Sequence, residues 1–407
     1  MPENVTIDAS MFMLRATPAH KLNRADHERM SPSAPAIIRF FRTELALWFS
    51  IATALVFVLF RPQWLSGLAN VIWLVTVFVW LFAAILWSAF AVVRHADCLA
   101  IRLGEPYGTL ILTFSVISIE IMMIAAVMIT GVDKPGLARD TMFSVLMIVL
   151  NGMIGASLLL GALRYREQQY NLQGANAFLA VIVPLAIVGL ILPNYTLASA
   201  GPTFSSAQAL SLVIMTVGIY AVFLSIETVR HRSDFIEPAD ASSKSGLARV
   251  RNHVKLSPRS VPYHAVLLLC YLLPVVVLSK KLAVPINLGI TVLGAPPALG
   301  GFIVAVLVLS PEGLGAIHAA LENQLQRAVN IFLGSALATI SLTIPAVLVI
   351  GLVTGEPVIL GLEPEESVML VLTLMVSIIT FGSGRTNVLL GAVHLLLFFT
   401  YFMLIFD

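Results

Sequence analysis

The sequence has 407 residues, of which 58% are apolar and only 11% are charged, with a formal net charge of +2 and a mean hydropathy of +0.94. A soluble domain of this length needs a charged surface, and so few charges cannot provide one. The composition therefore excludes an ordinary soluble protein and predicts a membrane protein. The small basic excess gives no support for nucleic-acid binding.

Eleven long apolar runs follow one another along the chain. Such runs are typical of transmembrane helices, which satisfy their own backbone groups in lipid, and they are too continuously apolar for barrel strands. The sequence therefore predicts an all-α polytopic membrane protein with about eleven transmembrane helices. The runs cover residues 44–60, 67–93, 107–131, 141–163, 174–193, 205–227, 264–279, 295–324, 328–353, 367–381 and 386–406.

Lys and Arg residues set the expected orientation of these spans, because they gather in cytoplasmic loops. If the polar N-terminal tail is cytoplasmic and the chain changes side at each span, most of the 24 basic residues lie in the cytoplasm. No signal peptide is expected before the first span. The exceptions on the outer side are Arg61, Lys134, Arg139, Lys280 and Lys281.

A polar, basic loop separates the first six spans from the last five. The positive-inside bias explains its charge, and regulation or binding of lipid head groups is the alternative. Cys98 and Cys270 lie on unrelated segments and offer neither a disulfide framework nor a CxxC metal site. The predicted organisation is a cytoplasmic tail (1–43), an extra N-terminal helix (44–60), a first five-helix repeat (67–227), a cytoplasmic linker (228–262) and a second five-helix repeat (263–407).

Two acidic residues, Glu120 and Glu312, lie near the middle of predicted spans, whereas the other acidic residues are expected in tails, loops or span ends. An ionised residue at this depth costs roughly 2.5–3.5 kcal/mol even on the lenient insertion scale. A protonated or hydrogen-bonded packing residue would be the simplest explanation for one such glutamate. Two of them in matching surroundings favour a functional site.

The surroundings of the two glutamates repeat along the chain. Each glutamate is followed by a helix start of similar sequence and then by a helix with small polar residues in its apolar wall. An odd number of spans in each repeat inverts the second copy, and inverted repeats with a site at the midplane are a transporter architecture. The matching pieces are 118–120 and 310–312, 137–139 and 325–327, and Asn151-Gly152 with Gly334-Ser335 and Thr339.

Glycine and proline crowd the segment around Glu312. Gly294, Pro296, Pro297, Gly300 and Gly301 precede it, and Pro311 and Gly313 flank it. Because proline removes a backbone donor and leaves a carbonyl free, we expect a broken helix here.

Free carbonyls, carboxylates, hydroxyls and an amide are hard oxygen ligands that suit Ca²⁺. Neither cysteine lies near a glutamate, so a soft metal is not expected. His318 and His394 also fall within predicted spans, and we interpret both as satisfied packing residues, with a proton relay as the alternative.

Three segments, Gly104–Glu120, Asn151–Asn176 and Ser310–Ala346, resemble the calcium/cation antiporter superfamily, and specifically its bacterial ChaA-like calcium/proton antiporters. The resemblance implies ten core helices in two inverted halves plus one N-terminal helix. It also implies that Glu120 and Glu312 bind the cation, as its metal ligands, and that Asn151 and Ser335 support them, together with the preceding Ser118 and Ser310. The repeats depart from the Gly-Asn-Ala-Ala-Glu motif of eukaryotic members, and ChaA-like relatives are also associated with Na⁺ and K⁺.

The predicted function is secondary active antiport of a cation against protons at a two-glutamate site. A deprotonated pair attracts a dication and a protonated pair releases it, so one site carries either load. Ca²⁺/H⁺ exchange is expected first, with Na⁺/H⁺ or K⁺/H⁺ exchange as the alternative.

Other classes fit less well. An intramembrane enzyme lacks a Ser-His or HExxH constellation and a phosphate loop, and a passive channel needs no titratable inverted sites. No cofactor is expected. The expected partners are the bilayer of a bacterial cytoplasmic membrane and the transported ions, with no nucleic acid; a homo-oligomer is compatible with the sequence.

Overall fold

The structure is a computed structural model that describes residues 36–59, 70–104, 107–128, 136–236 and 259–406. The chain forms two compact units, Met1–Trp48 and Phe49–Asp407. In the first unit, helix α2 (Ala36–Thr43) is followed by the start of α3 (Leu45–Leu59), and the Phe41 and Trp48 rings stack 4.6 Å apart. Residues 1–35 of the predicted tail, Arg61, Lys134 and residues 237–258 of the predicted linker lie outside the described residues.

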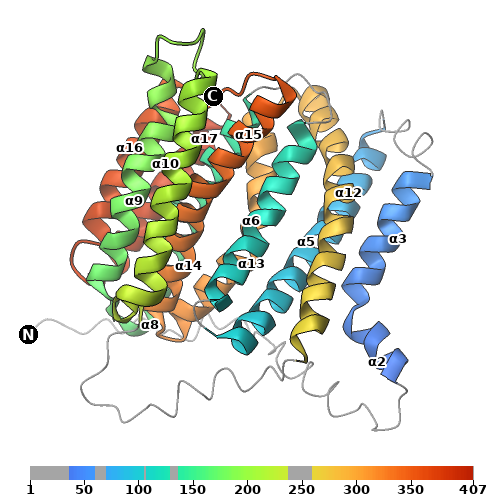
Figure 1. Ribbon diagram of the computed structural model, residues 1–407, viewed down its shortest axis with the longest axis horizontal. Coiled ribbons are helices and arrows are strands. Elements are labelled where there is room, and N and C mark those ends of the chain that lie inside the picture. The colour runs from blue at the N-terminus through green and yellow to red at the C-terminus, as the bar shows by residue number, and fades with distance from the viewer. Residues whose placement is uncertain (1–35, 60–69, 105–106, 129–135, 237–258, 407) are drawn as a thin grey trace, which may run out of the picture. The chain divides into compact units, whose positions relative to one another are not determined.

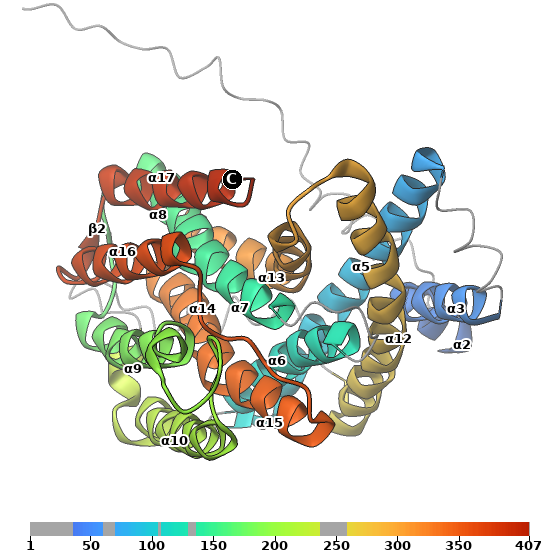
Figure 2. The ribbon, with the colours of Figure 1, turned by 90° about the horizontal axis from the view of Figure 1, so that it is seen from above.

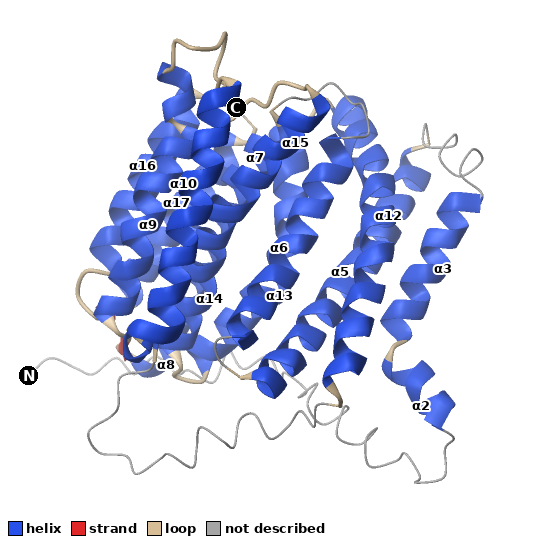
Figure 3. Cartoon of the chain, viewed as in Figure 1, coloured by secondary structure: helices blue, strands red, loops and turns tan. Residues whose placement is uncertain are grey.

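The second unit is almost entirely helical (Figure 3). Only one pair of two-residue strands, β1 (Gln168–Gln169) and β2 (Arg385–Thr386), joins two of its loops within the described residues. In chain order its long helices are α5 (Val71–Leu103), α6 (Tyr107–Met128), α7 (Leu137–Met147), α8 (Ile154–Tyr165), α9 (Leu172–Leu190), α10 (Ser206–Ser225), α12 (Val261–Leu293), α13 (Ala298–Leu321), α14 (Leu325–Ala338), α15 (Ile344–Thr354), α16 (Pro364–Thr380) and α17 (Val388–Leu404).

The predicted class of an all-helical, multi-pass membrane protein is confirmed. Within the described ranges, seven helical stretches are long and apolar enough to cross a membrane, and three shorter apolar helices accompany them. Two of the seven stretches combine several helices: α7 and α8 form one span (137–165), and α14 and α15 form another (325–354). The remaining short elements are the 3-10 turns η3 (Leu192–Tyr195) and η5 (Arg232–Phe235) and the π-helical turn η4 (Ile226–Arg230).

Two predicted spans are too short. Helix α5 continues ten residues beyond the predicted end at Val93, and α12 continues to Leu293 rather than ending at Ser279. Lys280 and Lys281 therefore lie inside α12 and not in an outer loop. The apolar pattern misplaced both ends because charged residues on a helix can extend toward water without interrupting the backbone hydrogen bonds. The two long helices pack against each other (Figures 1 and 2).

The two halves of the second unit share one unusual feature. The third span of each half is interrupted by a π-helical turn: η2 (Ile148–Met153) separates α7 from α8, and η6 (Thr339–Thr343) separates α14 from α15. A π-helical turn inserts one extra residue into the ladder of hydrogen bonds and is often found at functional sites. Both turns lie in spans that begin at the repeated motifs, at Leu137 and Leu325.

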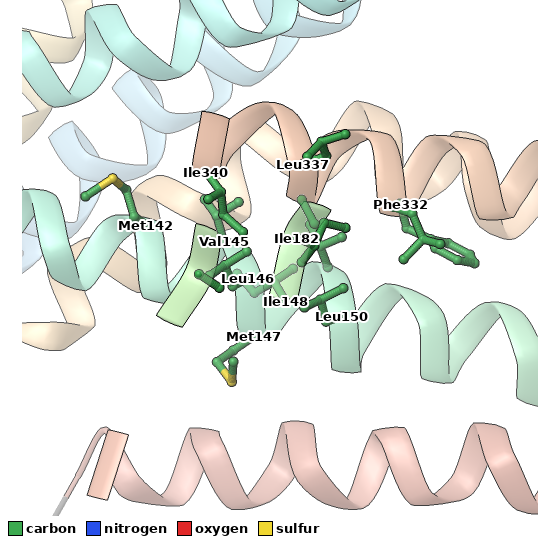
Figure 4. Packing of buried hydrophobic residues seen from close by; sticks show 14 of the residues in the cluster. Met142, Val145, Leu146, Met147, Ile148, Leu150, Ile182, Phe332, Leu337 and Ile340 are labelled. Carbon is green, nitrogen blue, oxygen red and sulfur yellow. The ribbon is translucent and has the colours of Figure 1, made fainter. Parts of the chain in front are cut away.

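Apolar side chains pack tightly around the two interrupted spans. Met142, Val145 and Leu146 from α7 belong to the same buried cluster as Leu337 from α14 and Ile340 from η6, part of which Figure 4 shows. All five are at most 1% exposed. This packing holds η2 and η6 in place, because a close-packed interior resists even small displacements.

Candidate cation site

The candidate site lies where α6, α13 and the α14–η6 segment meet. Helix α6 carries Glu120 and α13 carries Glu312, so each half of the fold contributes one carboxylate. The two carboxylates lie close enough to repel each other electrostatically. The structure thus brings together the two glutamates that the sequence singled out.

Glu120 is almost fully buried, with 2% of its surface exposed. Its Oε2 atom accepts a hydrogen bond of 3.0 Å from the Thr339 hydroxyl, at the first residue of η6. Its Oε1 atom is buried and has no hydrogen-bond partner among the described residues. One carboxylate oxygen is therefore held by the protein, and the other can take a ligand.

Glu312 has a similar neighbour on the other side. The Ser335 side chain of α14 lies beside its carboxylate, and its Oε2 atom is buried with no partner in the described part of the chain. Ser335 precedes Thr339 by one helical turn, about 5.4 Å. The hydroxyls next to the two carboxylates are thus neighbours on one face of a single helical segment.

A third hydroxyl continues this row. Thr343 follows Thr339 by four residues and lies beside Glu120. Its Oγ1 atom is buried and has no hydrogen-bond partner among the described residues. Hydroxyl and carboxylate oxygens are the ligands preferred by Ca²⁺ and by other hard cations. We call Glu120, Glu312, Ser335, Thr339 and Thr343 the oxygen cluster.

Two of the predicted supporting residues are used elsewhere. The Ser118 hydroxyl donates to the carbonyl of Phe114 and the Ser310 hydroxyl to that of Val306, each at 2.5 Å within its own helix. Serine in a helix interior commonly bonds back in this way. No hydrogen bond joins either serine to a glutamate among the described residues, although each hydroxyl oxygen can still accept.

Asn151, another predicted supporting residue, lies in η2 and is completely buried. Its amide nitrogen donates to the Thr373 hydroxyl at 2.9 Å and approaches the Met147 sulfur at 3.5 Å. Its Oδ1 atom lies 3.4 Å from Nδ1 of His394. The hydrogen bonds of Asn151 therefore go to side chains of α16 and α17. Among the described residues, no hydrogen bond joins Asn151 to either glutamate.

The expectation of a broken helix around Glu312 is wrong. Helix α13 is continuous from Ala298 to Leu321 with Pro311 inside it. The loss of one backbone donor is tolerated because neighbouring helices enclose this part of α13, and Pro311 itself is buried. The irregular backbone lies instead in η2 and η6, and the Pro296-Pro297 pair forms the turn before α13.

The two histidines differ. His394 is fully buried, as expected of a satisfied packing residue, with its Nε2 atom 3.0 Å from the Thr380 hydroxyl. His318 is not buried: its side chain is 72% exposed and pairs with Glu322 at 3.1 Å. It lies in the last turn of α13 on the exposed face of the helix, although Ala319 and Ala320 beside it are buried, so the packing interpretation of His318 is wrong.

Sequence reasoning left three residues near the glutamates out of the site. Thr339 and Thr343 belong to the oxygen cluster, and Asp97 of α5 is close enough to repel Glu312 electrostatically. Thr339 was matched with Asn151 in the repeat, and it follows Leu325 by as many residues as Asn151 follows Leu137, but it was not assigned to the site. Asp97 was hidden because the predicted span ended at Val93 and placed it in a loop.

The oxygen atoms of the cluster are ligands of the kind that hard cations prefer, and protons can occupy the same carboxylates. Two carboxylates carry a charge of −2 when ionised, with hydroxyls to complete an oxygen shell. Protonation of the same oxygens removes the charge that attracts the cation. Two buried carboxylates, one from each half of the fold, are typical of membrane transporters with a midplane ion site.

Comparison with known proteins places the chain in one family. The sodium/calcium exchanger protein family matches residues 73–229 and 263–406, and the chain belongs to this family. It is 46% identical to the sodium-potassium/proton antiporter ChaA of Escherichia coli K12, over 79% of this chain and 86% of that protein. It is 42% identical to the putative ionic transporter y4hA of Sinorhizobium fredii, over 78% and 85% respectively.

Solved structures show the same fold. Native YfkE matches with a TM-score of 0.67 at 17% identity, covering 89% of this chain and 98% of that one. The H⁺/Ca²⁺ exchanger CAX matches with a TM-score of 0.65 at 14% identity, covering 89% and 88%. At these identities the likeness concerns the arrangement of helices and not the ion.

Proposed function

We propose that this protein is a secondary active antiporter that exports Ca²⁺ in exchange for H⁺ by alternating access at the oxygen cluster. The observation that carries the proposal is the pair Glu120 and Glu312, each with a hydroxyl beside its carboxylate and one buried oxygen without a partner among the described residues. Two ionised carboxylates balance one dication, and two protons balance the same charge. The proposed location is a bacterial cytoplasmic membrane with the N-terminus inside.

Na⁺/H⁺ or K⁺/H⁺ exchange at the same cluster is the second candidate. It is favoured by the sodium-potassium/proton antiporter that shares 46% identity with this chain. Na⁺ also prefers oxygen ligands, so the donor set alone does not select Ca²⁺. A monovalent cation would need only one of the two carboxylates to ionise.

The deciding experiment measures ion flux in everted membrane vesicles under an imposed pH gradient, with Ca²⁺, Na⁺ and K⁺ compared. We expect ΔpH-driven uptake of Ca²⁺ by the wild-type protein. Glu120→Gln and Glu312→Gln keep the side-chain size but each removes one of the two negative charges and fixes that position in a neutral form, so each should abolish coupled Ca²⁺ flux while expression persists. Because the two carboxylates act as one unit, the double variant should be no worse than either single variant.

Robust Ca²⁺ flux in either Gln variant would contradict the proposal and return that glutamate to a packing role. Flux of Na⁺ or K⁺ without Ca²⁺ would select the second candidate.

A further inference from the structure

The buried polar side chains on the far side of η2 form a network that antiport at the oxygen cluster does not itself require. Asn151, Thr373, Thr380 and His394 are all completely buried. Uncompensated polar groups at such depth are costly, and yet here they are gathered from three elements, η2, α16 and α17. Such a grouping needs an explanation beyond packing.

The hydrogen bonds fix the state of the His394 ring. The amide nitrogen of Asn151 is used by Thr373 and Met147, so its Oδ1 atom is the acceptor that meets Nδ1 of His394. Nδ1 therefore carries the proton, and Nε2 accepts from the Thr380 hydroxyl. The backbone carbonyl of Leu150 also lies within hydrogen-bonding reach of the ring. His394 thus contacts two successive residues of η2.

The other π-helical turn behaves differently. Thr339, the counterpart of Asn151 in η6, donates to Glu120. By the repeat, Asn151 would be expected to donate to Glu312, but its amide is held by the network on α16 and α17 instead. Glu312 keeps a buried oxygen without a partner in the described chain. The two halves therefore differ at Asn151, which contacts His394 instead of a glutamate.

We propose that His394 is a positioning residue of the cation site, which holds the Asn151 amide away from Glu312 and thereby keeps that carboxylate available to the cation. This inference rests on the proposed function. Without the imidazole, the Asn151 amide can turn and donate to Glu312, where it competes with the cation for the same oxygen. His394 acts through Asn151 and does not itself touch the ion.

Two substitutions separate the two sides of the ring. His394→Asn keeps an amide donor at the place of Nδ1, toward Asn151, whereas His394→Gln keeps a polar group only at the place of Nε2, toward Thr380. We expect His394→Gln to raise the KM for the transported cation about tenfold, as loss of an outer-shell partner does, with the maximal rate nearly unchanged. His394→Asn should stay close to wild type. Thr400→Val is the matched control on α17, since that hydroxyl bonds only to the Leu396 carbonyl of its own helix.

A double-mutant cycle in the Asn151→Ala background tests the route. If His394 acts through Asn151, the effect of His394→Gln disappears in that background. Additive effects would overturn the inference, as would an unchanged KM for His394→Gln. A proton relay through the ring would overturn it in another way, because Asn and Gln would then both lower the maximal rate and shift its pH profile.

The outcome is separable from that of the proposed function. Exchange by the wild-type protein tests the function, and the KM differences among variants test His394. If His394→Gln does not fold, as judged by its melting temperature in detergent, Thr373→Val replaces it, because it removes the hydroxyl that accepts from the Asn151 amide. A several-fold higher KM supports the inference, and an unchanged KM rejects it.

Discussion

At the scale of single residues, the oxygen cluster is organised by one face of one span. Ser335 lies beside Glu312 and Thr339 donates to Glu120, although the glutamates come from opposite halves of the fold. A neutral hydroxyl can donate to an ionised carboxylate and can also offer its own oxygen to a cation. The same two side chains can therefore serve both the loaded and the protonated site.

We expect Ser335→Ala and Thr339→Val each to raise the KM for the cation about tenfold, near 1.4 kcal/mol, because each removes one contact of several. Thr339→Val keeps the branched shape, so helix packing should persist. The measurement is cation-dependent flux in everted vesicles with matched expression. Thr400→Val is the control, since that hydroxyl bonds back to the Leu396 carbonyl within its own helix. If both variants kept the wild-type affinity for the cation, neither hydroxyl would contribute to cation binding, and only the two carboxylates would remain as the site.

The two glutamates could be predicted from the sequence because a buried carboxylate is expensive and therefore conspicuous. Thr339 and Thr343 could not be singled out in the same way, since a hydroxyl in an apolar helix can bond to its own backbone at little cost. The direction of the Asn151 amide was also hidden. It depends on His394 and Thr373, which are far away in the sequence.

At the scale of elements, glycine allows two helices to approach closely. A Cβ atom on Gly391 of α17 would lie 2.5 Å from the backbone nitrogen of Leu159 on α8, and one on Gly155 would lie 2.8 Å from the backbone nitrogen of Leu395. Small residues of this kind are typical of helix contacts in membranes. This contact matters for the site because α17 carries His394 against η2.

We expect Gly391→Ala to lower the free energy of unfolding by about 1–3 kcal/mol, because backbone atoms cannot move aside as a flexible side chain can. The comparison is Gly218→Ala on α10, where an added Cβ would meet nothing within 4 Å. That change should be neutral or slightly stabilising. Melting temperatures of the purified proteins in one detergent measure both, and equal melting temperatures would show that α8 and α17 adjust freely.

A second contact between elements joins α5 to α12. The Arg259 backbone N–H donates to Nε2 of His264, so that ring donates its Nδ1 proton to Nδ1 of His95 at 2.9 Å. Both rings are buried. We expect His264→Leu to lower the free energy of unfolding by about 1–3 kcal/mol, since it leaves a buried acceptor on His95 without this donor.

The double variant His95→Leu/His264→Leu should lose less than the sum of the two single losses, because no polar atom of the pair then remains buried. Thermal unfolding in detergent measures the cycle. Strictly additive losses would contradict a direct bond between the rings.

The helical, multi-pass class followed from the lengths of the apolar runs, but the interruptions did not. A π-helical turn differs from an α-helix by one extra residue and has no composition of its own, so η2 and η6 left no pattern in the sequence. Pro311 gave a false signal of a break. Conversely, α5 and α12 extend past charged residues, and the hydropathy pattern therefore placed their ends too early.

At the scale of the whole chain, the two halves have the same order of helices but differ in their bonds at the site. Thr339 of η6 bonds to a glutamate, whereas Asn151, at the equivalent position of η2, bonds to side chains of α16 and α17. Alternating access in inverted repeats requires the halves to exchange roles. A state of the transporter that is open to one side of the membrane should therefore show such a difference between equivalent residues of the two halves.

The inverted arrangement also fixes which loops share a side of the membrane, and this supplies the last prediction. Ser199 and Ser233 lie on either side of α10, and a single crossing of that helix must place them on opposite faces. The positive-inside bias predicts Ser233 in the cytoplasm, near Arg230 and Arg232, and Ser199 outside. With Cys98 and Cys270 replaced, single cysteines at the two positions should react differently with an impermeant maleimide. In intact cells, Ser199→Cys should be labelled and Ser233→Cys protected, and in everted vesicles the pattern should reverse. Labelling of both positions from one side would mean that α10 does not cross, which would leave an even number of spans in the first half and remove the inversion on which a shared two-glutamate site depends.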